Sequence, residues 1–260
     1  MDMISWNPWH GCTKYSEGCA NCYVYRIDKH YSRDPSEFKI NKAFNLPISL
    51  NTKGNYKYPP NTVFFTCYTS DFFLDKADAY RNDAWKIIKQ RSDCMFMIIT
   101  KRIDMIYNRL PEDWRDGYDN VIITCTVENQ RQADYRLPIF LNLPIKHKFL
   151  CLEPLLGPIH IEQYLSSGQI SNIVCGGESG YGDTIRPCYE SWVLDLYNQA
   201  KMFNIPFCFK QTGTYFVPLF EPKISVWRGN QYNKAIECGY QDYRIDSMAD
   251  IIRDNTAGME

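Results

Sequence analysis

Three cysteines near the start of the chain are the residues best suited to chemistry. Cys12, Cys19 and Cys22 form the pattern C-x6-C-x2-C. The two-residue gap lets Cys19 and Cys22 grip one metal centre from a loop or a first helical turn, and the longer gap brings Cys12 to it from another side. Gly11 and Gly18 allow the tight backbone that this wrapping needs. Three thiolates with no nearby fourth leave one coordination position open.

Two kinds of metal centre suit these ligands. Zinc usually takes a fourth protein ligand, which His10 could supply to make a closed structural site. An iron-sulfur cluster on three thiolates instead leaves one iron free to bind a small molecule, which would make the site catalytic. The third alternative is that the thiols bind no metal. The spacing favours the cluster and leaves all three alternatives open.

The composition is that of a folded globular protein. The chain has 260 residues, of which 45% are hydrophobic, and its 29 Lys+Arg and 30 Asp+Glu give a net charge of -1. These values exclude a disordered, collagen-like or coiled-coil chain. No apolar run approaches the roughly 18 residues of a membrane span, and residues 1–10 do not resemble a signal peptide. We therefore expect a cytoplasmic protein with reduced thiols and no membrane partner.

Short apolar runs alternate with amphipathic stretches along the chain. Strands are predicted at 4–6, 63–67, 95–100, 121–126, 148–152, 170–175 and 206–210. Helices are predicted at 77–89, 103–110, 128–141 and 189–203. This alternation favours parallel strands with right-handed crossovers, in a doubly wound sheet or in a full or partial β/α (TIM-like) barrel. We favour the barrel.

Two parts of the chain do not follow this alternation. Residues 31–60 are rich in Asn, Lys, Tyr and Pro and are predicted to form an insertion in a barrel domain of residues 1–213. Residues 214–260 are predicted to form a C-terminal appendage, with one strand at 215–219 and a polar, frayed tail.

Polar residues follow most of the predicted strands. Because the carboxyl ends of barrel strands meet at one mouth, where barrel active sites lie, these residues should converge with the three cysteines. A helix cap or a solvated turn is the alternative explanation for each of them. Six other cysteines lie in or beside apolar strands, where cysteine is usually a small core residue. They are Cys67, Cys94, Cys125, Cys151, Cys175 and Cys208.

Several segments carry a resemblance to a known family. They are Trp6-Asn7-Pro8 with Gly11-Cys12, Gly18-Cys19-x-Asn21-Cys22-Tyr23, Thr100-Lys101-Arg102, Val127-Glu128-Asn129-Gln130, Leu152-Glu153-Pro154-Leu155-Leu156-Gly157-Pro158-Ile159, Gly176-Gly177-Glu178-Ser179-Gly180 and Phe209-Lys210-Gln211. Together they resemble the phage-associated three-Cys-motif family, a domain family of unknown function considered radical-SAM-like. The match keeps this order from Trp6 to about Gly213.

The resemblance implies a barrel of the radical SAM type with a 4Fe-4S cluster on Cys12, Cys19 and Cys22. In radical SAM enzymes the open iron binds S-adenosylmethionine, and an electron from the cluster cleaves the sulfonium bond to give a 5'-deoxyadenosyl radical. The usual signature of those enzymes is C-x3-C-x2-C, and the first gap is three residues longer here.

The barrel positions and the resemblance together select the other candidate site residues. The expected cofactor contacts are Ser70, Asp71, Glu128, Glu153, Gly176, Gly177, Glu178 and Ser179. The expected substrate contacts are Lys101, Arg102, Asn129, Lys210 and Gln211. No residue is assigned a catalytic role.

The resemblance also suggests partners. The family is found among phage and mobile-element genes, often with a separate three-Cys-motif partner protein, and this implies action on a nucleotide, nucleic-acid or protein substrate. The alternative hypothesis is a nucleic-acid- or partner-binding protein whose three-Cys site holds a structural zinc ion or an inert cluster.

Overall fold

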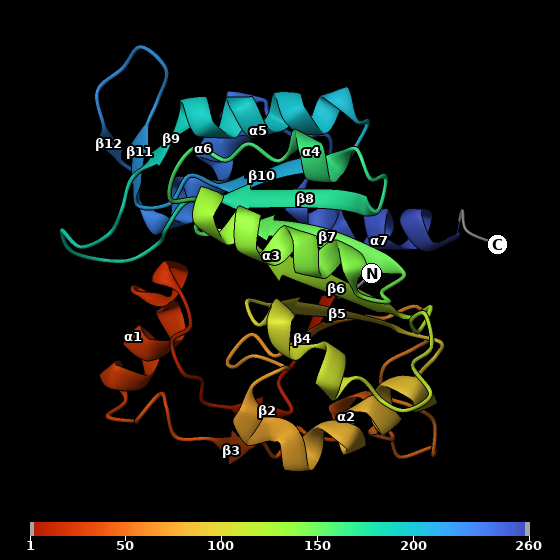
Figure 1. Cartoon of the computed structure of the whole chain (residues 1–260). Coiled ribbons are helices and arrows are strands. Elements are labelled where there is room, and N and C mark those ends of the chain that lie inside the picture. The colour runs from red at the N-terminus through yellow and green to blue at the C-terminus, as the bar shows by residue number, and fades with distance from the viewer. Residues whose placement is uncertain (1–2, 258–260) are drawn as a thin grey trace.

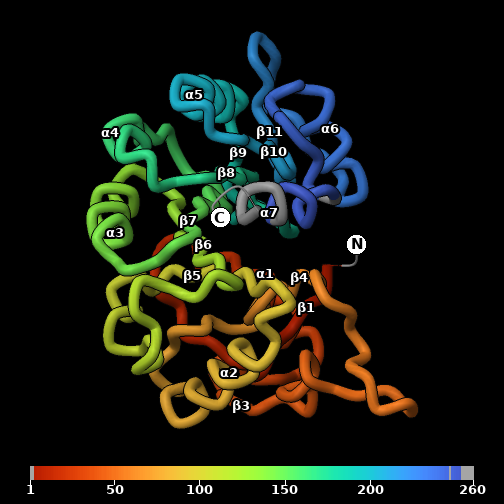
Figure 2. The backbone as a smooth tube through the Cα atoms, turned by 90° about the vertical axis from the view of Figure 1, so that its right-hand side faces the viewer, coloured from red at the N-terminus to blue at the C-terminus, as the bar shows by residue number. Residues whose placement is uncertain are grey.

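A curled sheet of seven parallel strands organises the molecule. This computed structural model describes residues 3–257. The strands are β1 (Met3–Trp6), β4 (Val63–Thr66), β5 (Met95–Thr100), β6 (Val121–Thr126), β7 (His147–Leu152), β8 (Ile170–Gly176) and β10 (Phe207–Gln211). They lie in the sheet in the order of the chain, and every neighbouring pair is parallel. The sheet forms a half-barrel, which confirms the prediction of a partial β/α barrel (Figures 1 and 2).

Helices cover the convex face of the sheet (Figure 2). The helices that follow strands β4, β6, β7 and β8 are α2 (Asp78–Gln90), α3 (Gln130–Asn142), α4 (Glu162–Leu165) and α5 (Glu190–Met202). Segment 103–110, predicted as a helix, forms two 3-10 turns at Ile103–Met105 and Tyr107–Arg109 instead. Pro111 disfavours the helical conformation at the residue before it, and Leu110 is extended.

The strand side chains alternate between two cores, as the two-residue period requires. On β4, Phe64 packs toward the helices while Val63 and Phe65 face the concave side. On β5, Phe96 and Ile98 pack outward in the same way. The concave face is therefore apolar and needs its own cover.

The C-terminal segment supplies that cover. Helix α7 (Met248–Ala257) lies in the concavity of the half-barrel (Figure 2), where Met248, Ala249 and Ile252 are buried against the sheet. Just before it, the Tyr243 hydroxyl donates a 2.7 Å hydrogen bond to Asn172 Oδ1 of β8. The prediction of a frayed polar tail is thus wrong for this stretch, because its few apolar residues recur on one helical face.

The remaining elements lie at the edges. Helix α1 (Tyr23–His30) follows the third cysteine, and β2 (Trp9–His10) pairs with β3 (Lys39–Ile40) from the insertion. A small sheet joins β9 (Cys188–Tyr189), β11 (Tyr215–Val217) and β12 (Ile224–Ser225), and α6 (Gln231–Cys238) follows it. Within residues 3–257, no helix has the length and apolar character to cross a bilayer.

Removing side-chain volume from α7 should destabilise the whole half-barrel. Ile252 is fully buried, so Ile252→Ala should lower the free energy of unfolding by about 2–5 kcal/mol in urea titrations, because it leaves a cavity in the concave core. Met202, which is 69% exposed at the end of α5, is the control, and Met202→Ala should change stability by less than about 0.5 kcal/mol. Equal effects of the two substitutions would contradict the packing of α7.

Candidate functional site

A cavity of about 630 Å³ opens at the carboxyl ends of the strands, inside the half-barrel. Its deep wall is built by inward-facing strand residues, among them Met97, Ile99 and Val174, and its floor includes Met248 of α7. Its rim carries polar groups from the loops that follow the strands. The position agrees with the mouth at which β/α barrels hold their active sites.

The three cysteines lie on the loop between β2 and α1, which crosses this mouth. Cys19 and Cys22 line the cavity, and Cys12 is not part of its lining. All three are free thiols of intermediate exposure. The pKa of Cys12 is raised to about 12, chiefly by burial and also by Asp71, Cys19 and Cys22, while Arg102 opposes the rise. The three thiols are therefore close enough to interact electrostatically.

Glu128 anchors the centre of this loop. Its carboxylate is fully buried at the end of β6 and accepts hydrogen bonds from the Ser16 hydroxyl and, at 3.3 Å, from the Gly18 backbone nitrogen. Arg136 of α3 fixes the carboxylate from the other side at 2.6 Å. A Cβ atom at Gly18 would lie 2.9 Å from Glu128 Oε1, so glycine is required for this close approach.

Arg102 holds the start of the loop from the end of β5. Its guanidinium donates to the Thr13 carbonyl oxygen at 2.9 Å and to the Thr13 hydroxyl at 2.8 Å. It also lies over the ring of Tyr15, 4.7 Å from the centroid, in a cation-π contact.

Glu178 holds the end of the loop from the segment after β8. It accepts a 2.9 Å hydrogen bond from Asn21 Nδ2 and three bonds from Arg186, one from the backbone nitrogen and two from the guanidinium. The same guanidinium also donates to the Glu17 carbonyl oxygen at 3.0 Å. Burial raises the pKa of Glu178, but the hydrogen bonds from Arg186 and Asn21 outweigh it and hold the pKa below its ordinary value. Glu178 is therefore an ionised anchor at neutral pH.

Three other candidate residues have structural partners as well. The Ser70 hydroxyl donates to the Gly11 carbonyl oxygen at 2.6 Å, and Asn129 caps helix α3 by accepting from the Gln132 backbone nitrogen at 3.0 Å. Asp71 is buried and accepts from the Thr100 hydroxyl at 2.8 Å.

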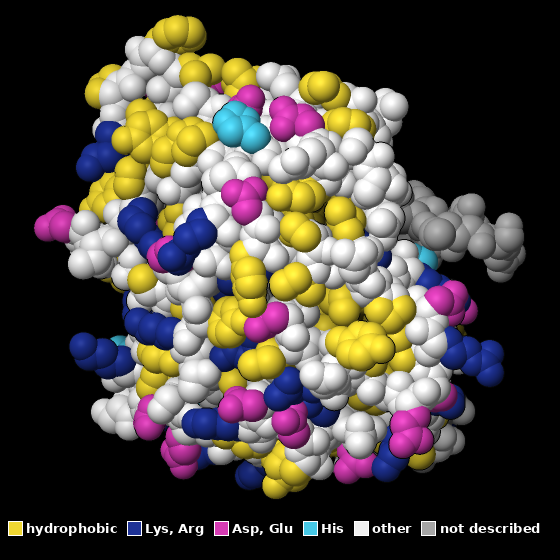
Figure 3. Space-filling model, in the orientation of Figure 1, with side chains coloured by type: hydrophobic (Ala, Val, Ile, Leu, Met, Phe, Trp, Pro, Cys, Tyr) yellow, Lys and Arg dark blue, Asp and Glu magenta, His cyan; other side chains and the backbone are white. Residues whose placement is uncertain are grey.

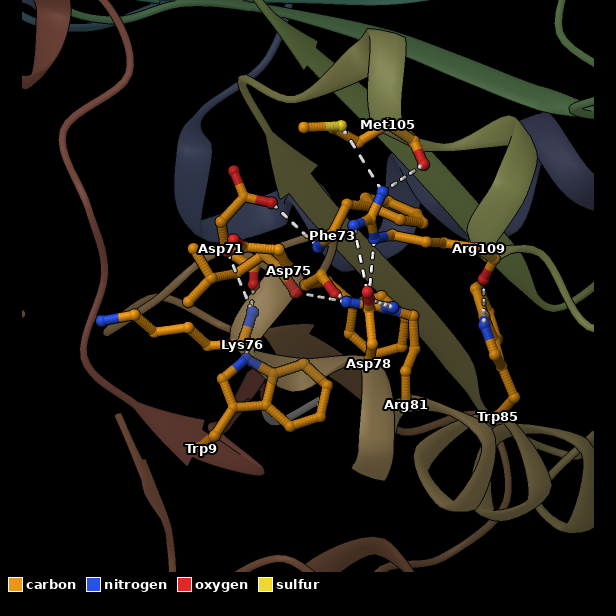
Figure 4. A network of polar contacts seen from close by, with 12 residues as sticks. Trp9, Asp71, Phe73, Asp75, Lys76, Asp78, Arg81, Trp85, Met105 and Arg109 are labelled. Carbon is orange, nitrogen blue, oxygen red and sulfur yellow. Dashed lines mark hydrogen bonds and ion pairs between the residues drawn. The ribbon is translucent and has the colours of Figure 1, made fainter. Parts of the chain in front are cut away.

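Asp71 also lies beside a separate polar network, outside the cavity lining. Figure 4 shows its contact with the Phe73 backbone nitrogen at 3.0 Å, next to a network in which Asp78 pairs with Arg81 and Arg109. Arg81 also donates from Nε to the Phe72 carbonyl oxygen at 2.8 Å, which joins the loop after β4 to helix α2.

The remaining candidates surround the cavity. Lys101, Glu153, Lys210 and Gln211 face it, as do Gly177, Glu178 and Ser179. Gly176 is absent from the lining and lies in the wall, where a Cβ would meet Gln211 and Glu153 at 3.1 Å.

One ion pair dominates this part of the rim. Lys210 Nζ donates to the two Glu153 carboxylate oxygens at 3.1 and 2.8 Å, and Gln211 Nε2 donates to Oε1 at 2.7 Å. Burial lowers the pKa of Lys210, and the interaction with Glu153 outweighs this and raises it. Lys210 therefore stays charged next to the Glu153 carboxyl group.

Sequence reasoning missed the deeper wall. Thr124 and Thr126 of β6 line the cavity with their side chains, as does Cys151 of β7. The sequence of β6 does contain a signal for this surface. Thr124 and Thr126 are two residues apart, so they share one face of the strand, and two polar residues on one face of a buried strand indicate an inner surface. All six strand-associated cysteines are buried, as predicted. Cys151 has the further role of lining the cavity.

The described residues contain no preformed site for a single metal ion. Within residues 3–257, no three His, Cys, Asp or Glu side chains are grouped closely enough to hold one. His10, the candidate fourth zinc ligand, places its Nε2 atom 2.8 Å from Asp28 Oδ2.

A comparison with protein-family models matches residues 2–236 to a family described as a protein of unknown function (DUF5131). The chain belongs to this family. Neither the curated proteins nor the solved structures gave a match. The DUF5131 match includes the three-Cys loop, all seven strands of the half-barrel and most of α6, and it ends before α7.

The loop of this DUF5131 member should be sensitive to a single methyl group. Gly18→Ala should lower the free energy of unfolding by about 1–3 kcal/mol, because the added Cβ meets a carboxylate that Arg136 prevents from moving away. Gly157 has open space around its Cβ position, so Gly157→Ala is the matched control and should be neutral or slightly stabilising. Thermal and urea unfolding of both variants test this, and an undisturbed Gly18→Ala protein would contradict the close contact.

Proposed function

We propose that the protein is a radical SAM-like iron-sulfur enzyme of the cytoplasm. Cys12, Cys19 and Cys22 would hold a 4Fe-4S cluster, with S-adenosylmethionine as the second cofactor. The observation that carries the proposal is the position of the three-Cys loop, which crosses the mouth of the half-barrel with Cys19 and Cys22 on the cavity wall. A structural knuckle would need no place at that mouth.

The donor set fits such a cluster. All three thiols are free and sit on one loop, and binding a metal centre itself displaces the thiol protons. A cluster separates its thiolates farther than a single ion does, which is compatible with three cysteines that are near one another but not gathered at one point. Three thiolates also leave one iron with an open position for a small molecule.

When bound, the cluster and S-adenosylmethionine supply a reactive radical. The chain then has two tasks, to fix the position of the cysteines and to shield the reaction from solvent. Arg102, Glu128 and Glu178 perform the first task through their bonds to the loop. The apolar wall and α7 floor perform the second, because they close the cavity from below.

The ion pair of Glu153 with Lys210 is placed to orient a bound molecule. It lies on the cavity rim, and its carboxylate can accept from an amino or hydroxyl group without carrying an uncompensated charge. We propose a nucleotide, nucleic-acid or protein substrate, and action with a separate three-Cys-motif protein in a phage or mobile-element setting.

Metal analysis tests the proposal directly. After anaerobic reconstitution with iron and sulfide, the chain should hold about four irons and four sulfides and absorb visible light, because three thiolates retain a 4Fe-4S cluster. Cys12→Ala, Cys19→Ala and Cys22→Ala should each lose most of this iron, and only the wild type should cleave S-adenosylmethionine under reducing conditions.

Cys238→Ala is the matched control. Cys238 is half-buried on α6 and does not line the cavity, so its removal should leave the iron content unchanged. About one zinc per chain without a chromophore would overturn the proposal in favour of a structural metal site. Full iron loading in the three loop variants would overturn the assignment of the ligands.

A further inference from the structure

Two buried hydroxyl groups in the cavity wall have no partner. Thr124 and Thr126 of β6 are 0% and 1% exposed, and within residues 3–257 neither side-chain oxygen has a hydrogen-bond partner. Both side chains line the cavity. A buried hydroxyl left unpaired costs about 1–3 kcal/mol. Such groups indicate a ligand that forms their missing hydrogen bonds.

The surroundings of the two hydroxyls limit what that ligand can be. Met97 and Ile99 flank them on β5, and Val174 lies across the cavity wall on β8. These side chains offer apolar surface and no charge. The deep part of the cavity therefore suits an uncharged group with apolar faces and hydrogen-bonding edges, because a charged group there would lose its hydration without compensation.

The rim of the same cavity is cationic. Arg26, Lys101, Lys210 and Arg228 line it. Its carboxylates are already paired, Glu153 with Lys210 and Glu178 with Arg186. In the part of the chain that the structure describes, the Lys101 ammonium has no carboxylate partner. The rim thus favours an anionic group at the entrance.

Exposed aromatic rings stand beside these cations. Trp227 and Tyr181 are each 75% exposed. Trp227 precedes Arg228, and Arg26 lies over the Tyr181 ring, 5.5 Å from its centroid. Figure 3 shows Lys and Arg side chains gathered at the left of the face, on the side where α1 and the hairpin of β11 and β12 lie in Figure 1. Exposed rings next to cations suit stacked bases and phosphates.

From these observations we propose that the cavity binds one nucleotide unit. Its base enters the deep pocket and hydrogen-bonds with Thr124 and Thr126, and its phosphate remains at the rim near Lys101. An amino-acid side chain would fill the pocket but would leave the cationic rim without a counterion. The nucleotide belongs to a single strand of nucleic acid, whose neighbouring bases stack on the exposed rings. That this nucleotide is the substrate of the reaction rests on the proposed function.

Binding to the full chain as purified, without reconstitution, tests the site. The probes are deoxynucleoside monophosphates, the matching nucleosides and a short fluorescein-labelled single-stranded DNA. Thr124→Val and Thr126→Val should each weaken binding about 3- to 10-fold, because each removes one hydrogen bond and keeps the shape of the side chain.

The same two variants should become more stable without ligand. Removing an unpaired buried hydroxyl should raise Tm by about 2–4 °C. Thr66→Val on β4 is the matched control, because Thr66 is buried and outside the cavity lining, and it should leave binding unchanged. Weaker nucleotide binding together with a higher Tm identifies a ligand site. If the hydroxyls had only a structural role, the affinity and the Tm would both fall.

Lys101→Ala tests the phosphate end. The substitution should weaken the binding of the monophosphates and the DNA but leave the binding of nucleosides unchanged. It should also reduce the salt dependence of DNA binding. Tight binding of the DNA with weak binding of the monophosphates shows that the bound nucleotide belongs to a strand. Tight binding of the monophosphates with weak binding of the DNA shows that it is a free nucleotide. Unchanged affinity in both threonine variants, or no binding of any probe, would overturn the inference.

The outcomes separate this inference from the proposed function. If nucleotides bind but no cluster is retained, the pocket stands and the radical chemistry fails. If the cluster loads but no nucleotide probe binds, the enzyme assignment stands and the substrate class is wrong.

Discussion

A buried ion pair between Glu128 and Arg136 supports the loop that carries the three cysteines. Both side chains are fully buried, so neither charge is stable in its place without the other. The pair links β6 to α3 on the barrel side, and the free carboxylate oxygen then takes hydrogen bonds from Ser16 and Gly18 on the loop side. The position of the loop is therefore tied to the packing of the barrel itself.

Tyr15 extends this anchor across the loop. The guanidinium groups of Arg102 and Arg136 lie over its ring, 4.7 and 5.8 Å from the centroid. Its hydroxyl donates to Asp104 at 2.5 Å. The loop thus meets cations from two successive strand–helix units. A loop held in this way has a defined backbone path, so its three cysteines occupy fixed places along the mouth of the half-barrel.

The elements of the barrel could be predicted because their signals are local. Strands β5 and β6 coincide with the predicted segments 95–100 and 121–126, since each is a run of apolar and β-branched residues bounded by polar ones. Helix α7 could not be predicted as cover for the sheet, because its few apolar residues gain stability only against a concave face that other strands build. Segment 103–110 had the helical period, but it forms 3-10 turns that end at the extended Leu110, before Pro111.

The sequence predicted where the candidate site lies but not which residues its side chains contact. Strand ends located Glu128 and Glu178 near the cysteines, yet the sequence does not show that Glu128 meets Gly18 across 110 residues of chain. The ligand contacts expected of Glu128 and Glu178 remain predictions, and the structure adds that both residues hold the loop. Thr124 was predicted only as part of a strand. It lines the cavity, and its hydroxyl has no hydrogen-bond partner in the part of the chain that the structure describes.

This contrast separates two uses of polar residues in the half-barrel. The anchors around the loop have their hydrogen bonds completed within the chain, so they stabilise the fold with or without a ligand. Within residues 3–257 the hydroxyls of Thr124 and Thr126 have no such bonds, so they lower the stability of the protein by itself. Selection for stability alone would favour valine at both positions, since it fits the strand equally well. Hydroxyls kept there against that preference are consistent with a molecule that enters the barrel and completes them.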